Sequence, residues 1–168
     1  MARRRARAVA RGAHGCRSRG RRLSLRLRIA AVGRLRDPAW RALLDGYASR
    51  LQRYARFEEI ELRDDAETEA RFARLLSQGA HGVALDVGGE PWTSARLARF
   101  VEERERTASV PVVFCIGGSH GLPAAVIRRC ALRLSLSSMT LSHALARLVL
   151  FEQLYRAFTI VRGEPYAH

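Results

Sequence analysis

Short apolar runs alternate along this chain with longer segments in which apolar residues return every three or four positions. The short runs are typical of buried β-strands, and the longer segments are typical of amphipathic helices. Predicted strands cover residues 27–33, 57–62, 82–87, 110–116 and 132–136, and predicted helices cover residues 38–54, 64–77, 94–106, 122–131 and 141–160. This regular alternation predicts an α/β fold, with a mainly parallel sheet covered by helices on both faces.

Local signals support several of these boundaries. Asp37 followed by Pro38 is typical of an N-cap and a first helical residue, and Thr93 is placed to cap the third helix. No internal repeat or low-complexity tract follows residue 24, so residues 25–168 are expected to form one domain. The longest apolar runs are well short of the length that spans a membrane.

The positive charge of the chain is concentrated at its beginning. All 30 basic residues are arginine, and with 16 acids they give a net charge of +14. Residues 1–24 hold nine arginines and no acid, which leaves 21 arginines and 16 acids, a net +5, in the rest. A mildly basic body is consistent with an RNA partner. The first 24 residues carry too little apolar surface to pack, and three interpretations stay open: a start assigned upstream of Leu25, a disordered RNA-binding tail, or an organellar presequence.

The three cysteines argue against a metal site. Cys16, Cys115 and Cys130 are odd in number and lack the spacing of metal ligands. Cys115 lies in a predicted strand and Cys130 in a predicted helix, so buried thiols in a reducing cytoplasm are expected.

Two loops of small residues follow the last two predicted strands. Residues 117–121 read GGSHG, where glycines would let a ligand approach the backbone and the next helix would offer free N–H groups. The alternative is a tight strand-to-helix turn. The loop lacks the lysine of a Walker phosphate loop and the GxGxxG spacing of a Rossmann fold. Residues 136–141 read LSSMTL, where hydroxyls could bind polar cofactor edges, or Thr140 or Ser142 could merely cap the last helix.

The last predicted helix mixes ionisable side chains with many apolar ones. His143, Arg147 and Arg156 recur at spacings that bring them towards one broad face, with Glu152 between the two arginines. Arginines are usually solvated on helix surfaces, but an apolar helix leaves few positions for water, so a buried or interfacial partner is expected. His143 could instead be a packing residue of the first turn.

The chain resembles a known family over roughly residues 25–168. Three motifs carry this resemblance: IGGSHGL, LSSMTLSHALARLVLFEQLYRAF and EPYAH. The family comprises the bacterial RlmH-type enzymes, which methylate N3 of a pseudouridine in 23S ribosomal RNA. They are SPOUT-class methyltransferases that use S-adenosylmethionine, and the resemblance implies a C-terminal trefoil knot and a homodimer. The periodicity of the chain does not itself indicate a knot.

The resemblance also implies roles for individual residues. Those expected at the cofactor are Leu85, Gly117, Leu136, Ser137, Ser138, Met139, Thr140 and Leu141. Arg156, His143, Arg147 and Tyr166 are expected at the substrate. The tail departs from the family pattern, because Ala167 stands where the family has histidine and His168 comes one position later.

The implied reaction is methyl transfer to a base nitrogen, for which the protein must mainly align the methyl donor and the acceptor. Arg156 or Arg147 could stabilise the anion formed at N3, and His143 or Glu152 could accept its proton. The substrate is expected to be the assembled 70S ribosome, because a body of +5 has few charges with which to hold free RNA. The alternatives are a non-catalytic ribosome-associated RNA-binding protein and a nucleotide-binding module that uses the IGGSHGL loop.

Overall fold

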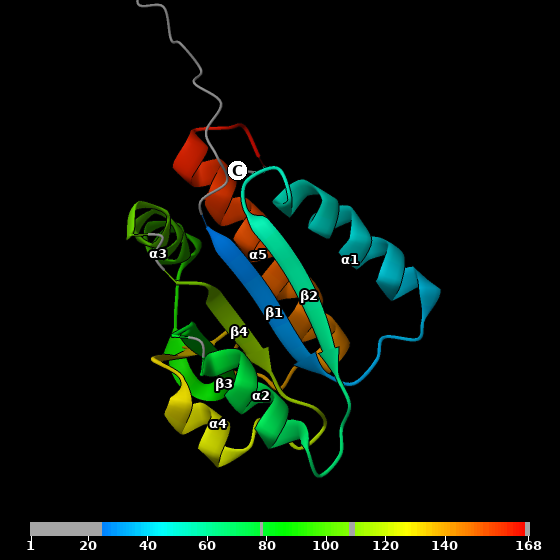
Figure 1. Ribbon diagram of the computed structural model, residues 1–168. Coiled ribbons are helices and arrows are strands. Elements are labelled where there is room, and N and C mark those ends of the chain that lie inside the picture. Colours follow the sequence, from blue (N-terminus) through cyan, green and yellow to red (C-terminus); the bar gives the residue numbers. More distant parts are fainter. Residues whose placement is uncertain (1–24, 78, 108–109, 167–168) are drawn as a thin grey trace, which may run out of the picture.

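The computed structural model describes residues 25–77, 79–107 and 110–166. Residues 1–24, Cys16 among them, and the tail residue His168 lie outside these ranges. The strands are β1 (Arg26–Val32), β2 (Arg56–Leu62), β3 (His81–Pro91), β4 (Val112–Ile116) and β5 (Leu132–Ser135). The helices are α1 (Pro38–Leu51), α2 (Thr68–Leu76), α3 (Ser94–Thr107), α4 (Ala124–Arg129) and α5 (His143–Arg162). Strand and helix alternate as the sequence predicts (Figure 1).

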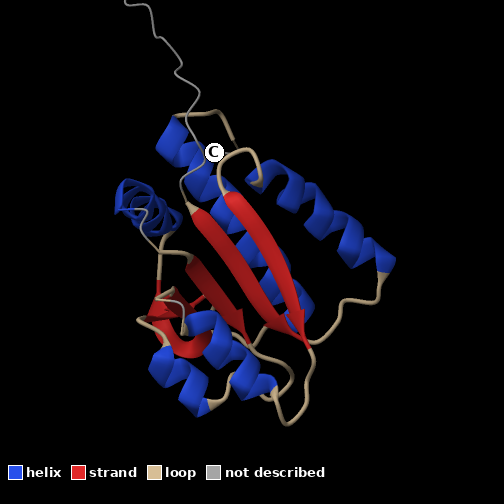
Figure 2. Ribbon diagram, viewed as in Figure 1, coloured by secondary structure: helices blue, strands red, loops and turns tan. Residues whose placement is uncertain are grey.

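The five strands form one parallel sheet in the order β2-β1-β4-β3-β5. Helices α1, α3 and α5 cover one face, and α2 and α4 cover the other (Figure 2). Because side chains alternate along a strand, each central strand serves both cores. On β4, Phe114 packs with the α1, α3 and α5 side, whereas Cys115 packs with α2 and α4. This confirms the predicted α/β class, with helices on both faces of a parallel sheet.

Several element boundaries differ from the sequence prediction, and for two of them the structure shows the cause. β3 was expected to end at residue 87 but runs to Pro91, because the chain bulges and pairs with β5 a second time, Glu90 opposite Leu134. A Cβ atom on Gly89 would lie 2.8 Å from the Leu134 backbone, so only glycine allows this second approach.

The second difference is at α2, which begins at Thr68 instead of residue 64. The preceding residues form a turn in which the Asp65 carboxylate accepts the Glu67 N–H at 2.9 Å and the Thr68 hydroxyl accepts the Asp65 N–H at 3.0 Å. Such side-chain bonds compete with helical hydrogen bonds, so the helix starts later than its charge pattern suggests.

The starts of α1 and α5 follow their capping residues. Asp37 accepts the Ala39 N–H at 2.8 Å ahead of Pro38, and Ser142 accepts the Leu145 N–H at 3.3 Å. Thr93 likewise accepts the Arg96 N–H at 3.2 Å before α3. The predicted caps at Asp37, Thr93 and Ser142 are therefore confirmed.

Candidate active site

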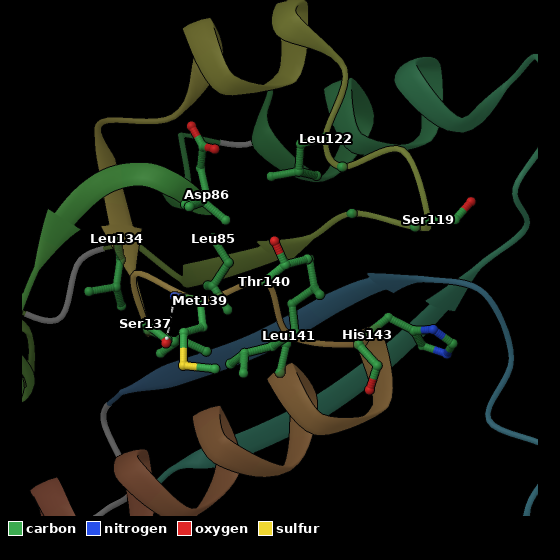
Figure 3. Close-up of a pocket in the computed structure, with 18 residues that line it drawn as sticks. Leu85, Asp86, Ser119, Leu122, Leu134, Ser137, Met139, Thr140, Leu141 and His143 are labelled. Atoms are coloured by element: carbon green, nitrogen blue, oxygen red, sulfur yellow. Dashed lines mark hydrogen bonds between the residues drawn. The ribbon is translucent and has the colours of Figure 1, made fainter.

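A cavity of about 450 Å³ opens at the carboxyl ends of β3, β4 and β5 (Figure 3). Its volume lies within the usual range of small-molecule sites, which parallel sheets favour at this edge. Three segments form the wall: residues 85–87 of β3 at the start of its bulge, the glycine loop after β4, and the segment from the end of β5 to the first turn of α5. Apolar side chains and small polar groups dominate this wall.

Most of the residues expected at the cofactor do line this cavity. They are Leu85, Gly117, Leu136, Ser137, Met139, Thr140 and Leu141. Ser138 belongs to the same loop, but its side chain is exposed and does not line the cavity. Met139 is 73% exposed, so an apolar side chain lies at the mouth. The structure thus brings together segments that are far apart in the sequence.

The serine-rich loop is held by its own side chains. The Ser135 hydroxyl donates to the Ser137 carbonyl at 2.9 Å, and the Ser137 hydroxyl accepts the Met139 N–H at 2.9 Å. These bonds fix the loop before a ligand arrives, which lowers the entropic cost of binding.

Gly117 is required by the glycine loop itself. A Cβ atom there would lie 2.5 Å from the Leu122 nitrogen and closer still to the Gly121 carbonyl group. Gly121 has φ of +77°, and its N–H donates to the Gly118 carbonyl at 3.1 Å. A side chain at Gly117 would therefore displace the returning arm of the loop before it could occupy space in the cavity.

His143 lies at the junction of the cavity and β1. It is the first residue of α5 and lines the cavity, and its Nε2 atom is buried with no hydrogen-bond partner in the described ranges. A Cβ atom on Gly33, just after β1, would lie 3.9 Å from this Nε2. The ring is thus available to accept or donate a proton at the cavity wall.

Arg147 does not lie where a substrate could reach it. Its side chain is 0% exposed, and its guanidinium donates to Glu61 at 2.8 Å, to Val32 O at 3.3 Å and to Gly33 O. Burial opposes ionisation of Glu61, but the Leu35 N–H and the Arg147 guanidinium outweigh it and lower the pKa of this carboxyl. In this conformation the expected contact of Arg147 with RNA is not supported; the side chain joins α5 to the ends of β1 and β2.

Arg156 and Tyr166 form a second cluster near the end of α5. Arg156 contacts Glu152 at 2.6 Å and lies over the Tyr166 ring, 5.1 Å from its centroid. The Tyr166 hydroxyl is 3.3 Å from both Glu152 and the Tyr47 hydroxyl, and burial raises the pKa of Tyr166. These residues border a separate hollow of about 480 Å³.

The two groups of expected catalytic residues are far apart within one chain. His143 and Arg156 are separated by thirteen positions of a continuous helix, or about 20 Å along its axis. Within one chain, His143 and Arg156 therefore cannot contact the same base, whichever helix face they share.

Asp86 is a cavity residue that the sequence analysis missed. It follows Leu85 directly, and its carboxylate accepts the Arg133 Nε–H at 3.0 Å. Among the described residues that line the cavity, it is the one with a carboxylate. The sequence signal that could have identified it is its position directly after Leu85, near the end of a predicted strand.

Comparison with known proteins agrees with this arrangement of strands and loops. A family model described as "Predicted SPOUT methyltransferase" matches residues 25–168. The chain belongs to the SPOUT methyltransferase family. Membership confirms the fold class and the methyltransferase activity that the resemblance implied, with S-adenosylmethionine as methyl donor. The C-terminal knot stays a prediction.

Individual relatives match this chain over nearly their full length. "Ribosomal RNA large subunit methyltransferase H" of Sorangium cellulosum is 47% identical over 146 residues, which cover 86% of this chain and 100% of that protein. The protein of the same name from Gloeobacter violaceus is 42% identical, with 86% and 99% covered. Among solved structures, a probable methyltransferase from Bordetella pertussis has a TM-score of 0.53 at 15% identity, with 80% of this chain and 97% of that chain covered. This last likeness concerns the fold alone.

Proposed function

We propose that this SPOUT methyltransferase transfers a methyl group from S-adenosylmethionine to N3 of a pseudouridine in 23S ribosomal RNA. The observation that carries the proposal is the cavity at the ends of β3, β4 and β5, lined by the residues that the family resemblance assigns to the cofactor. Relatives named as ribosomal RNA large subunit methyltransferases support the RNA class. The enzyme would act in the cytoplasm, on the assembled 70S ribosome.

The cavity wall has the chemistry that S-adenosylmethionine requires. Leu85, Leu136 and Leu141 offer apolar contact to an adenine ring, while Ser137 and Thr140 can bond its polar edges. Gly117 keeps the opposing loop close, and Met139 and Ser138 complete the serine-rich loop. When bound, the cofactor supplies an activated methyl group, so the chain must mainly position the acceptor nitrogen.

The substrate end of the site would be completed by a second copy of the chain. Arg156 lies about 20 Å along α5 from His143, too far to act on the same base within one chain, and Tyr166 packs against Arg156. A homodimer that places the end of one α5 near the cavity of its partner would unite them. Arg156 would then stabilise negative charge on the base, and Tyr166 would stack on it.

The methyl group would move from sulfur to N3 while the N3 proton leaves to a base of the protein, and S-adenosylhomocysteine remains. His143 Nε2 and the Glu152 carboxylate are the two candidates for that base. His143 has an unpartnered buried nitrogen beside the cavity, whereas Glu152 is held by Arg156 and Tyr166.

A methyl-transfer assay that compares 70S particles, free subunits and naked RNA tests the proposal, with mass mapping of the modified nucleotide. We expect methylation of a 23S pseudouridine on 70S particles only. Arg156→Ala should abolish transfer and leave cofactor binding unchanged in calorimetry. Methyl on a ribose or a guanine would overturn the substrate, and absence of cofactor binding by the wild type would favour the non-catalytic RNA-binding alternative.

A further inference from the structure

The loop between β1 and α1 exposes two arginines that have no role in the site described above. Arg34 and Arg36 are exposed, while Leu35 between them packs against the larger core. This alternation is typical of an extended segment, in which every second side chain points to the same side. Two guanidinium groups therefore project from the same side of this loop into solvent. Within the described ranges neither has a hydrogen-bond or ion-pair partner.

The backbone of this loop is fixed by buried contacts. The buried Arg147 donates to the carbonyls of Val32 and Gly33, immediately before Arg34. The Leu35 N–H donates to Glu61 at 3.0 Å, and beyond Arg36 the chain enters α1 through its Asp37 cap. A ligand would therefore meet arginines on an ordered backbone, and only their side chains would lose freedom on binding.

The nearby carboxylates are engaged by other groups. Glu61 is bound by Arg147 and Leu35, and Glu59 is bound by Arg41 at 2.6 Å and Arg147 at 3.4 Å. Asp37 is engaged with the Ala39 N–H. These contacts leave the positive charge of Arg34 and Arg36 directed to solvent, where it can attract an anion.

The loop also adjoins the cavity. It leaves the carboxyl end of β1 (Figure 1). The lining residues place the cavity at the same edge of the sheet. A Cβ atom on Gly33 would lie 3.9 Å from Nε2 of His143, which lines the cavity wall. RNA whose target base enters the cavity would therefore pass its backbone close to Arg34.

We propose that Arg34 and Arg36 form a phosphate clamp that holds the backbone of the substrate RNA beside the target nucleotide. The proposal rests on the proposed function. Guanidinium groups match phosphate geometry with two parallel hydrogen bonds, and phosphate contacts set the register of a protein on a nucleic acid without reading its sequence. The clamp acts on substrate binding and not on the cofactor.

The test uses the double variant Arg34→Gln, Arg36→Gln in the full chain. The matched control is Arg128→Gln, Arg129→Gln, which removes two exposed arginines from the end of α4, at the opposite edge of the sheet. The substrates are 70S particles whose 23S RNA is unmethylated. For the clamp variant we expect KM for particles to rise on the order of tenfold, with kcat little changed and affinity for S-adenosylmethionine unchanged.

Salt titration gives a second readout. Each lost phosphate contact lowers the slope of log affinity against log salt by about 0.7 to 0.9, so the clamp variant should lose about 1.5. The control should keep the wild-type KM and slope. A clamp variant that behaves like the control, or that loses its dimer in sedimentation, would overturn the clamp. If the wild type transfers no methyl group, the proposed function fails. The clamp can still be tested, because the salt dependence of binding to the particles can be compared between the wild type and the clamp variant.

Discussion

At Arg147 a full positive charge is buried inside the protein, where its energy depends on its partners. Its guanidinium reaches two carboxylates, Glu61 and Glu59, and two strand-end carbonyls, while Nε lacks a partner in the described ranges. Arg147→Ala leaves Glu61 and the ends of β1 and β2 without this donor. We expect a loss of about 3–5 kcal/mol in the free energy of unfolding, measured with urea.

Arg71→Ala is the control for Arg147→Ala. Arg71 also contacts two carboxylates, Asp65 at 2.7 Å and Glu67 at 3.1 Å, but at the surface. Its removal should change the unfolding midpoint far less, because water replaces an exposed ion pair. Equal losses for the two variants would contradict the structural role of Arg147.

Glu61 makes part of this stability depend on pH. Its pKa is lowered in the folded protein, so it stabilises the fold above its unfolded pKa, and this contribution is lost as pH falls through the folded value. The difference in unfolding free energy between wild type and Glu61→Gln should thus be largest near about pH 7 and shrink towards about pH 3. Urea titrations across this range measure it, and a difference independent of pH would be inconsistent with the ion pair.

A substitution at the single residue Gly117 tests the link between the glycine loop and cofactor binding. Gly117→Val should displace the arm at Gly121 and Leu122 and abolish binding of S-adenosylmethionine in calorimetry, while circular dichroism still shows the α/β fold. Gly46→Ala is the control: a Cβ atom there meets nothing within 4 Å, and alanine favours a helix. Cofactor binding that survives in Gly117→Val would show that the loop can relax without loss of the site.

At the scale of elements, the sequence predicted which segments form strands and helices better than it predicted where they pair. The residues that line the cavity could be predicted because they follow strands directly and match family motifs. The bulge of β3 could not be predicted, because it depends on the close approach of Gly89 to Leu134 of another strand. A buried or interfacial partner was expected for the arginines of α5, but the partners of Arg147 could not be identified in advance, because they come from β1 and β2, distant in sequence.

Helix α5 gives a test of the two-chain site. His143→Ala and Arg156→Ala should each be inactive alone, because every site needs both residues. The two residues lie at opposite ends of the helix, so in a dimer they come from different chains. In mixed dimers one of the two sites would combine wild-type His143 with wild-type Arg156 of the partner. An equal mixture, unfolded and refolded together, should therefore recover about a quarter of wild-type methyl transfer. If the mixture stays inactive while mixed dimers form, both residues act within one chain.

At the scale of the whole molecule, the described fold begins at Leu25. Leu25 is 1% exposed, and its carbonyl accepts the Arg56 N–H at 2.9 Å. A chain that starts at Leu25 should therefore bind cofactor and sediment as a dimer like the full chain, with weaker nonspecific RNA binding at low salt. Loss of the dimer on truncation would show that the basic head has a structural role.

The order of strands has a consequence for synthesis of the protein. β1 lies between β2 and β4, so Leu27 pairs first with Phe57 and gains its other neighbour, Val112, only much later. Until β4 leaves the ribosome, a nascent β1-β2 pair has an open apolar edge that other chains could join. The cavity forms later still, because β5 and the first turn of α5 complete its wall. The growing chain therefore acquires cofactor binding last, after the sheet around it has formed.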